Sequence, residues 1–243
     1  DTTAANAAYQ GLLAADGDPL INSTTSENYP PGSTFKLVTA AAALESGSYT
    51  PESVLSAPDV YTLPGTRTTL PNFGGSSCGA NEQTTLADAL RISCNTAFAS
   101  LGVDLGDEAI REQADRFGFD RADLTVPMRV AASTYPEDLN DAQTALSAIG
   151  QESVRATPVQ MAMVASAIAN GGSLMTPYLV QTVRTANLDV VSEAEPTELS
   201  EAVSGTTAQQ LTDMMVGVVQ SGSGTSAQIS GVQVAGKTGT APD

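Results

Sequence analysis

The sequence contains no histidine, and lysine occurs only twice in its 243 residues, at Lys36 and Lys237. Without imidazole there can be no Ser-His-Asp triad, no Cys-His dyad and no zinc site that needs histidine ligands. A catalytic base in this chain must therefore be a lysine, an aspartate, a glutamate or a tyrosine.

Basic residues are scarce as a class. Lys and Arg total 10 against 27 Asp and Glu, which gives a formal net charge of −17. Nucleic-acid binding depends on basic groups that displace counter-ions from phosphates, so this composition excludes nucleic acid as a main partner.

Long apolar runs are also missing. None approaches the roughly 18 residues of a membrane span, and the first residues have neither the basic end nor the apolar stretch of a signal peptide. If the parent protein is exported, we expect its targeting segment upstream of this chain. The only two cysteines, Cys78 and Cys94, could form one disulfide or remain two buried free thiols.

Hydrophobic periodicity predicts a helix-rich, mixed α/β chain without internal repeats. Residues 33–44 are apolar almost all round, which predicts a buried helix that ends at Gly47. Residues 48–83 read as an extended connection with one hairpin, and residues 120–140 as a loop. Further helices are predicted over 85–91, 95–105 and 110–117, the last ending before Gly118. Two more begin at Thr157 and Thr206, and the first of these has an apolar stripe of Met161, Val164, Ala165 and Ile168. Strands are predicted over 178–185, 188–191 and 231–241.

Ser33 and Lys36 are one helical turn apart on the first of these helices. Both side chains project from one face, so a hydroxyl and an amine can share a proton there. Burial disfavours the charged form of a lysine, which makes Lys36 a candidate base for Ser33, and the helix N-terminus favours a developing oxyanion. The alternative is a serine that caps the helix beside a lysine that reaches the surface.

Two further polar motifs follow in the chain. Residues 93–95, Ser-Cys-Asn, lie in or beside the turn between two predicted helices, where a helix cap is the alternative interpretation. Lys237 is followed by Thr-Gly-Thr on a predicted strand whose edge could receive an extended peptide that ends in a carboxylate, although a turn with a solvated lysine is the simpler alternative. The order Ser-x-x-Lys, Ser-x-Asn, Lys-Thr-Gly is that of penicillin-binding proteins and class A β-lactamases, and here it uses both lysines.

With these motifs the sequence resembles the transpeptidase domain of the penicillin-binding proteins, which crosslink bacterial peptidoglycan. The resemblance runs from about residue 20 to residue 241 and is greatest with the monofunctional class B enzymes of actinobacteria. It rests on residues 29–36, 93–98, 149–151, 157–158, 169–172 and 237–241.

The resemblance implies the fold and the domain organisation. We expect an α/β fold of the penicillin-binding protein and serine β-lactamase type, with a helical lobe and an antiparallel sheet lobe. Residues 1–243 would be the central part of one transpeptidase domain, incomplete at both ends.

The resemblance also implies roles for individual residues. Ser33 would be the nucleophile and Lys36 its general base. Ser93 would pass a proton to the leaving amine, and Asn95 would hold the substrate amide. Lys237 would be the partner of Ser93, and Thr238, Gly239 and Thr240 would bind the donor carboxylate. The backbone N–H groups of Ser33 and Thr240 would form the oxyanion hole. The resemblance also implies a disulfide between Cys78 and Cys94. No metal or cofactor is implied.

The implied activity is that of a peptidoglycan D,D-transpeptidase, which transfers an acyl group from a D-Ala-D-Ala stem peptide to a neighbouring amine and is acylated by β-lactams. The protein would act in cell division or in the maintenance of cell shape. It would lie outside the cytoplasmic membrane, held by an N-terminal anchor absent from this chain. Its partners would be cell-wall synthesis or division proteins. Alternatives are a DD-carboxypeptidase, a β-lactam sensor domain that signals without turnover, and a serine β-lactamase. The last would need a Glu-x-x-Leu-Asn stretch, and the sequence from Glu137 to Asn140 is one residue short of it. The pattern favours a polar helix start after Pro136 instead.

Overall fold

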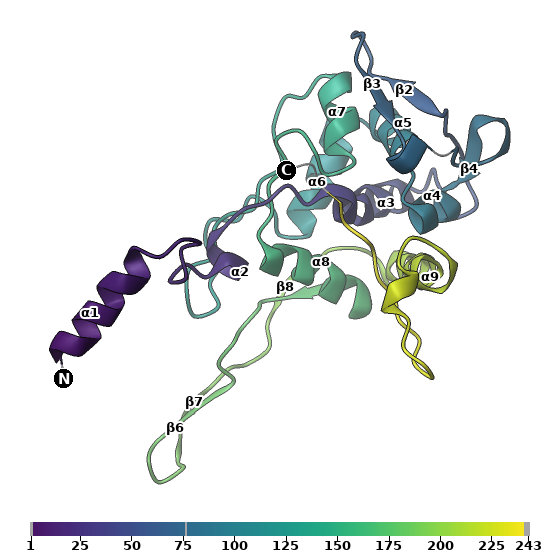
Figure 1. The fold of residues 1–243 in the computed structure, drawn as a ribbon. Helices are drawn as coiled ribbons and strands as arrows, with labels where there is room; N and C mark the ends of the chain where they lie inside the picture. The colour runs from purple at the N-terminus through teal and green to yellow at the C-terminus, as the bar shows by residue number, and fades with distance from the viewer. Residues whose placement is uncertain (1, 76, 241–243) are drawn as a thin grey trace.

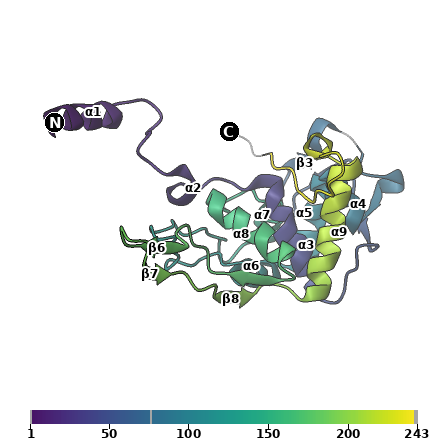
Figure 2. The same ribbon diagram turned by 90° about the horizontal axis from the view of Figure 1, so that it is seen from below.

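The computed structural model describes residues 2–75 and 77–240 as one helical body from which two segments project (Figure 1). One of them is the N-terminal helix α1 (Thr2–Leu13), which buries no residue and lies away from the body in both perpendicular views (Figure 2). The short helix α2 (Ser23–Ser26), capped by Asn22, leads from α1 into the body. Neither helix was predicted from the sequence.

Helix α3 (Lys36–Glu45) lies at the centre of the body (Figure 1). The 3₁₀ turn η1 (Gly32–Phe35) leads directly into it, and every residue from Lys36 to Leu44 is buried. Helices α5 (Asn95–Leu105), α6 (Asp107–Arg116) and α9 (Gly205–Ser221) pack around α3. The prediction of a helix without a polar face is confirmed, and its burial follows from that composition.

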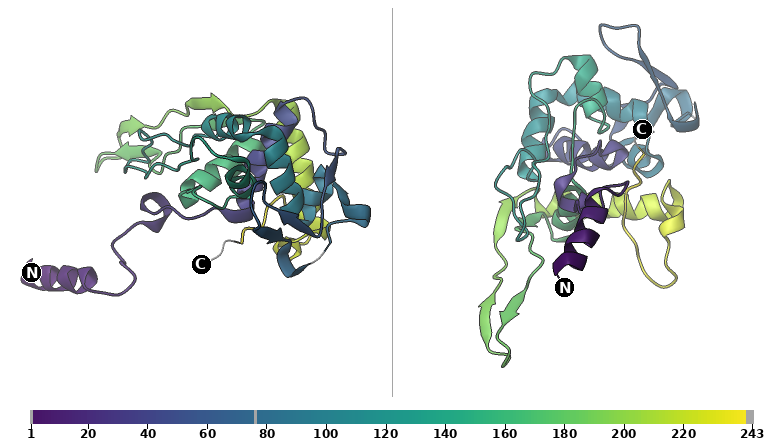
Figure 3. Two further views of the ribbon diagram at one scale, coloured as in Figure 1. Left: turned by 90° about the horizontal axis from the view of Figure 1, so that it is seen from above. Right: turned by 60° about the vertical axis from the view of Figure 1, so that its left-hand side comes forward.

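The other helices complete the shell around α3. Helix α4 (Leu86–Ile92) packs against α9, and α7 (Asp141–Ser147) packs against α5. Helix α8 (Pro158–Ala169) contacts α9 (Figure 3). The predictions of α4, α5 and α6 and of a loop over residues 120–140 are confirmed, and α7 begins at the helix start expected after Pro136.

Two helix starts differ from the sequence-based prediction. Thr157 caps α8 as expected, but the side chain of Gln160 donates to the carbonyl of Phe117 at 2.7 Å instead of reaching back to the cap. The buried apolar stripe of the helix is Met163, Val164, Ala167 and Ile168 rather than the predicted set, and Gln160 is buried on the same helix. The cap of α9 is Ser204, whose hydroxyl accepts from the Thr207 N–H, and not Thr206.

The strands form four separate antiparallel pairs in the described part of the chain. The predicted hairpin in residues 48–83 is β2 (Val60–Thr62) with β3 (Thr69–Pro71), and the predicted hairpin after α8 is β6 (Thr182–Arg184) with β7 (Val190–Glu193). The second hairpin is the other projecting segment (Figure 1). The two pairs that were not predicted are β1 (Val54–Ser56) with β4 (Gln83–Thr85), and β5 (Ser173–Met175) with β8 (Glu198–Glu201).

The prediction of a strand over residues 231–241 is wrong for its described residues, 231–240. Val232 forms only an isolated bridge with Ile229, and the Gly236 N–H donates to the Met215 carbonyl at 3.2 Å. Alternation of side chains defines a face, but a strand also needs a neighbouring backbone for its hydrogen bonds. In the part of the chain that the structure describes, no other segment forms a ladder with this one.

None of the helices within residues 2–75 and 77–240 has the length and apolar character needed to cross a membrane. In the same residues, no group of His, Cys, Asp and Glu side chains is arranged to hold a metal ion.

Candidate active site

Residues from all three motifs meet in one cavity of about 400 Å³. Its walls come from η1, from the segment after β3, from the junction of α4 and α5, and from the C-terminal segment. The lining residues are Ser33, Phe73, Ile92, Ser93, Asn95, Gln151, Ser223, Thr238, Gly239 and Thr240.

Ser33 lies half-buried in η1, one residue after the close contact of two glycines. The Gly32 N–H donates to the Gly150 carbonyl at 2.9 Å, and a Cβ on Gly150 would overlap the Gly32 backbone. Both glycines have positive φ, 54° for Gly32 and 73° for Gly150, which glycine adopts without strain. This contact brings Ser33 and Gln151 to the same cavity.

Lys36 is fully buried at the start of α3, and its amine points toward the α4–α5 junction. Its Nζ donates to the Ser93 carbonyl at 2.8 Å and to Asn95 Oδ1 at 2.7 Å, and lies 3.3 Å from Ser93 Oγ. The ring of Phe98 lies beneath it, 5.6 Å from Nζ. No hydrogen bond joins Lys36 to the Ser33 hydroxyl among the described residues.

Burial holds the pKa of Lys36 well below its usual value, and the charge of Lys237 lowers that pKa further. Burial also lowers the pKa of Lys237, to about 8. Both shifts favour the neutral amine, and a neutral amine can accept a proton.

The Ser93 hydroxyl lies between the two lysine amines. Lys237 Nζ donates to Ser93 Oγ at 2.8 Å, and Lys36 Nζ is on the other side of the same oxygen at 3.3 Å. Ser93 adopts a left-handed conformation, φ 63°, at the C-terminus of α4, and Cys94 then starts α5. This local break turns the Ser93 side chain toward both lysines, as expected for a tripeptide in a turn.

The C-terminal segment reaches the cavity without being part of a sheet. Lys237 Nζ also contacts the carbonyl of Thr238 at 3.0 Å, and the hydroxyl groups of Thr238 and Ser223 are 2.6 Å apart. A Cβ on Gly239 would come within 2.9 Å of the Thr34 side chain, so the glycine allows this segment to lie close to η1. The hydroxyl groups of Thr238 and Thr240 and the neighbouring lysine provide donors for an anionic group.

Cys78 and Cys94 are joined as a disulfide in the structure, with their Cα atoms 5.9 Å apart. The bond ties the segment after β3 to the N-cap residue of α5, in the α4–α5 junction. It brings the long connection of residues 48–83 against the site.

Four residues that line the cavity were not singled out from the sequence: Phe73, Ile92, Gln151 and Ser223. Phe73 is 83% exposed, which is unusual for a side chain of its size. Ile92 immediately precedes Ser93, and Gln151 ends a tripeptide on which the resemblance rests, so their positions were the available signals. Ser223 lies in a run of glycine and serine that carries no such signal.

Glu137 is exposed to solvent and is not among the residues that line the cavity. Asn140, three residues later, caps α7 through a capping box with Gln143. The stretch that could have supplied a deacylating glutamate is therefore the start of a helix.

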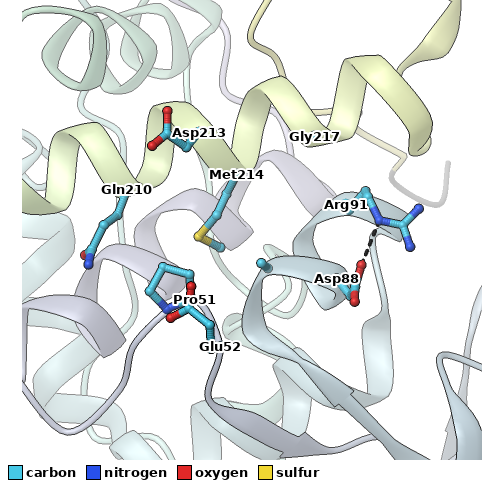
Figure 4. A pocket seen from close by; sticks show the side chains of 9 residues that line it. Pro51, Glu52, Asp88, Arg91, Gln210, Asp213, Met214 and Gly217 are labelled. Carbon is cyan, nitrogen blue, oxygen red and sulfur yellow. Dashed lines mark hydrogen bonds and ion pairs between the residues drawn. The ribbon is translucent and has the colours of Figure 1, made fainter.

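A second cavity, of about 370 Å³, lies between α4 and α9 (Figure 4). Figure 4 shows Asp88 paired with Arg91 on α4, at 2.8 Å, and Met214 extending from α9. None of the motif residues lines this cavity.

Comparison with known proteins gives consistent matches along the chain. A family model described as the penicillin binding protein transpeptidase domain matches residues 2–242. Peptidoglycan D,D-transpeptidase PbpA of Mycolicibacterium smegmatis is 42% identical over 241 residues, which are 99% of this chain and 49% of that protein. PbpA of Mycobacterium tuberculosis is 42% identical over 234 residues, 96% of this chain and 47% of that protein.

Solved structures match as well. The crystal structure of PBPA from M. tuberculosis superposes with a TM-score of 0.90 at 41% identity, over 97% of this chain and 53% of that one. The imipenem acyl-enzyme complex of penicillin-binding protein A from M. tuberculosis gives 0.92 at 40% identity, over 99% of this chain and 55% of that one. The chain thus spans about half the length of the curated relatives it matches.

Proposed function

Because the chain belongs to the penicillin-binding protein transpeptidase family, we propose that it is the central part of the catalytic domain of a peptidoglycan D,D-transpeptidase. In this proposal it crosslinks stem peptides by serine acyl transfer, and β-lactams acylate the same serine. The observation that carries the proposal is the chain of polar contacts from Lys36 through Ser93 to Lys237 beside a cavity that Ser33 lines.

In the first step Ser33 attacks the carbonyl carbon of the penultimate D-Ala. A neutral Lys36 amine has two N–H groups, and the Ser93 carbonyl and Asn95 Oδ1 accept them at 2.8 and 2.7 Å. Its lone pair is then free to take the proton of the Ser33 hydroxyl, so that a C–O bond forms and the carbonyl oxygen becomes an oxyanion. The low pKa of the buried amine supports this role.

In the second step the peptide C–N bond breaks and D-Ala leaves as an amine. Ser93 donates its hydroxyl proton to that nitrogen and receives one from the Lys36 ammonium, 3.3 Å away. Lys237, at 2.8 Å on the other side, holds the Ser93 oxygen in place and contributes positive charge. The proton of Ser33 thus reaches the leaving group, and the acceptor amine of a second stem peptide reverses the steps.

The remaining groups of the cavity bind substrate in this proposal. Thr238, Gly239 and Thr240 hold the terminal carboxylate of the donor, next to the charge of Lys237. Asn95 holds the substrate amide, and the backbone N–H groups of Ser33 and Thr240 bind the oxyanion. Stem peptides lie outside the cytoplasmic membrane, and we place the protein on that side, where a disulfide persists.

The experiment is to label the protein with a fluorescent penicillin and to map the adduct by peptide mass spectrometry. We expect a single adduct on Ser33. Ser33→Ala should abolish labelling and keep the circular dichroism spectrum, while the control Ser56→Ala, an exposed serine on β1, should label normally. Label on another serine, or full labelling of Ser33→Ala, would disprove the assignment.

The lifetime of the adduct separates the alternatives. Histidine is absent and Glu137 lies outside the cavity, so among the described residues we find no base dedicated to water beside Lys36 and Ser93, which serve the acceptor amine. The adduct should persist for many minutes after free drug is removed. Its loss within seconds, with repeated turnover of penicillin, would indicate a β-lactamase. Release of D-Ala from a D-Ala-D-Ala peptide without crosslinking would indicate a carboxypeptidase. Acylation by the β-lactam without any reaction of that peptide would indicate a sensor domain.

A further inference from the structure

Asn72 belongs to none of the three motifs, yet its side chain is the contact that anchors the start of α5. It follows β3, which packs against α5 (Figure 1), and only 6% of its surface is exposed. It does not line the cavity, so it can act on a substrate only through other residues.

The Asn72 amide bonds to the first residues of α5. Its Oδ1 accepts the backbone N–H of Asn95 at 3.0 Å and that of Thr96 at 3.1 Å, and its Nδ2 lies 3.2 Å from the Thr96 hydroxyl. The first N–H groups of a helix have no partner within the helix and are usually bound by a preceding serine, threonine, aspartate or asparagine. Here that position is Cys94, whose disulfide-bonded sulfur accepts the Ala97 N–H at 3.5 Å and also lies 3.5 Å from the Thr96 hydroxyl and from Asn72 Oδ1. Asn72 supplies the missing acceptor from a different segment.

The neighbouring residue completes the hold on Asn95. That residue is Pro71, whose carbonyl accepts a hydrogen bond from Asn95 Nδ2 at 3.3 Å. With Nδ2 held there, Asn95 Oδ1 is turned toward Lys36 Nζ, 2.7 Å away. Pro71 and Asn72 thereby fix both the backbone and the amide orientation of Asn95. That orientation decides which hydrogen of the Lys36 amine is bound and where its lone pair points.

We propose that Asn72 is a positioning residue for acylation, which holds Asn95 so that Asn95 in turn orients the Lys36 amine. The proposal rests on the proposed function. Loss of the side chain removes the acceptor of two N–H groups, and an Asn95 free to rotate no longer binds the amine in one geometry. The chemical step then slows. Initial binding of a β-lactam depends on Asn72 only through Asn95, one of several residues that line the cavity, so binding should change much less than the chemical step.

Two variants test this role in the full chain. Asn72→Ala removes the amide. Asn72→Asp keeps an oxygen acceptor for both N–H groups and adds a negative charge, which is favourable at a helix N-terminus. The matched controls are Asn187→Ala and Asn187→Asp, at an exposed turn of the β6–β7 hairpin. Stopped-flow acylation with a fluorescent β-lactam separates the initial dissociation constant from the acylation rate constant.

We expect Asn72→Ala to lower the acylation rate constant by about tenfold or more with the dissociation constant changed by less than about threefold. In Asn72→Asp the added carboxylate favours the charged form of Lys36, so the rise of the acylation rate with pH should move to higher pH by about half a unit or more. Both Asn187 variants should match the wild type. Equal rate constants in Asn72→Ala and the wild type, or a loss confined to the dissociation constant, would overturn the proposal.

A second readout does not depend on acylation. The side-chain amide signals of Asn95 in a ¹⁵N NMR spectrum, identified by their absence in Asn95→Ser, should be dispersed in the wild type and collapse toward free-amide values in Asn72→Ala. Unchanged signals would overturn the positioning role. If the wild type is not acylated at Ser33, the proposed function fails while this spectrum still decides the role of Asn72. If Asn72→Ala does not fold, the test passes to Asn72→Asp. A profile of its acylation rate against pH that superposes on that of the wild type would overturn the positioning role of Asn72.

Discussion

Removal of the Cys78–Cys94 disulfide is expected to lower the free energy of unfolding by about 3 kcal/mol. The two residues are 16 positions apart in the chain. In the chain-entropy model a closed loop of this length removes about 10 cal/mol/K from the unfolded chain, which is about 3 kcal/mol at 25 °C. The variant to measure is Cys78→Ala with Cys94→Ser, because a serine at the first position of α5 can still accept the Ala97 N–H.

Urea unfolding followed by circular dichroism gives the magnitude. With a slope of about 2 kcal/mol per molar urea, the midpoint should fall by about 1.5 M. Dithiothreitol should lower the midpoint of the wild type by a similar amount and leave the double variant unchanged. The control Ser77→Ala, next to Cys78 and exposed, should behave as the wild type in both conditions.

Two results would refute the reasoning. The first is the titration of two thiols in denatured protein that has never been reduced, since both sulfurs would then be free. The second is a wild-type midpoint that does not respond to reductant although mass spectrometry shows the bond to be reduced. In that case the bond exists but does not constrain the unfolded chain.

Lys36→Arg should reduce acylation by about a hundredfold or more, because arginine does not give up its proton; a near-normal rate would assign the base elsewhere. Lys237→Arg should retain measurable acylation and lose the decline expected in the wild type above about pH 8, where the Lys237 amine becomes neutral; a rate–pH profile that still declines would contradict this. Gly102→Ala should lower the free energy of unfolding by about 1–3 kcal/mol, because a Cβ there would overlap the Ala148 methyl group. Urea midpoints check this against Gly11→Ala, whose Cβ meets nothing, and equal midpoints would contradict it.

The parts of the site that could be predicted are those set by short stretches of sequence. Ser33 and Lys36 are joined by one turn, so their approximate relation follows from helix geometry alone. Ser93 lies between two predicted helices, which predicts its place in a turn. The burial of α3 follows from its lack of polar residues.

The parts that could not be predicted depend on contacts between distant segments. Asn72 acts on α5 from 23 or 24 positions away, and nothing in its own neighbourhood signals this. The face of α8 is a similar case. Residues 161–165 are all apolar, so their pattern does not choose between Met161 and Met163. In the structure Met163 is buried near Gly118, beside the bond from Gln160 to the Phe117 carbonyl.

The start of helix α7 has a local signal. Helix α7 has only seven residues, which is short for a periodicity argument. Asn140 followed by Gln143 is a capping box, and both of its hydrogen bonds are present in the structure. The strand predicted over residues 231–241 is the opposite case, because its local alternation is real but its pairing depends on segments far along the chain.

The two lysines reach the Ser93 hydroxyl across chain separations of 57 and 144 residues. During folding, the longer of these loops costs about 0.8 kcal/mol more entropy to close than the shorter one. The helices that pack around α3 span a similar range of the chain, from α5 to α9. Lys237 follows every α-helix of the described residues, so during synthesis the second amine reaches Ser93 last. A nascent chain that extends through α9 but not to Lys237 carries Ser33 and Lys36 but lacks the second amine at Ser93.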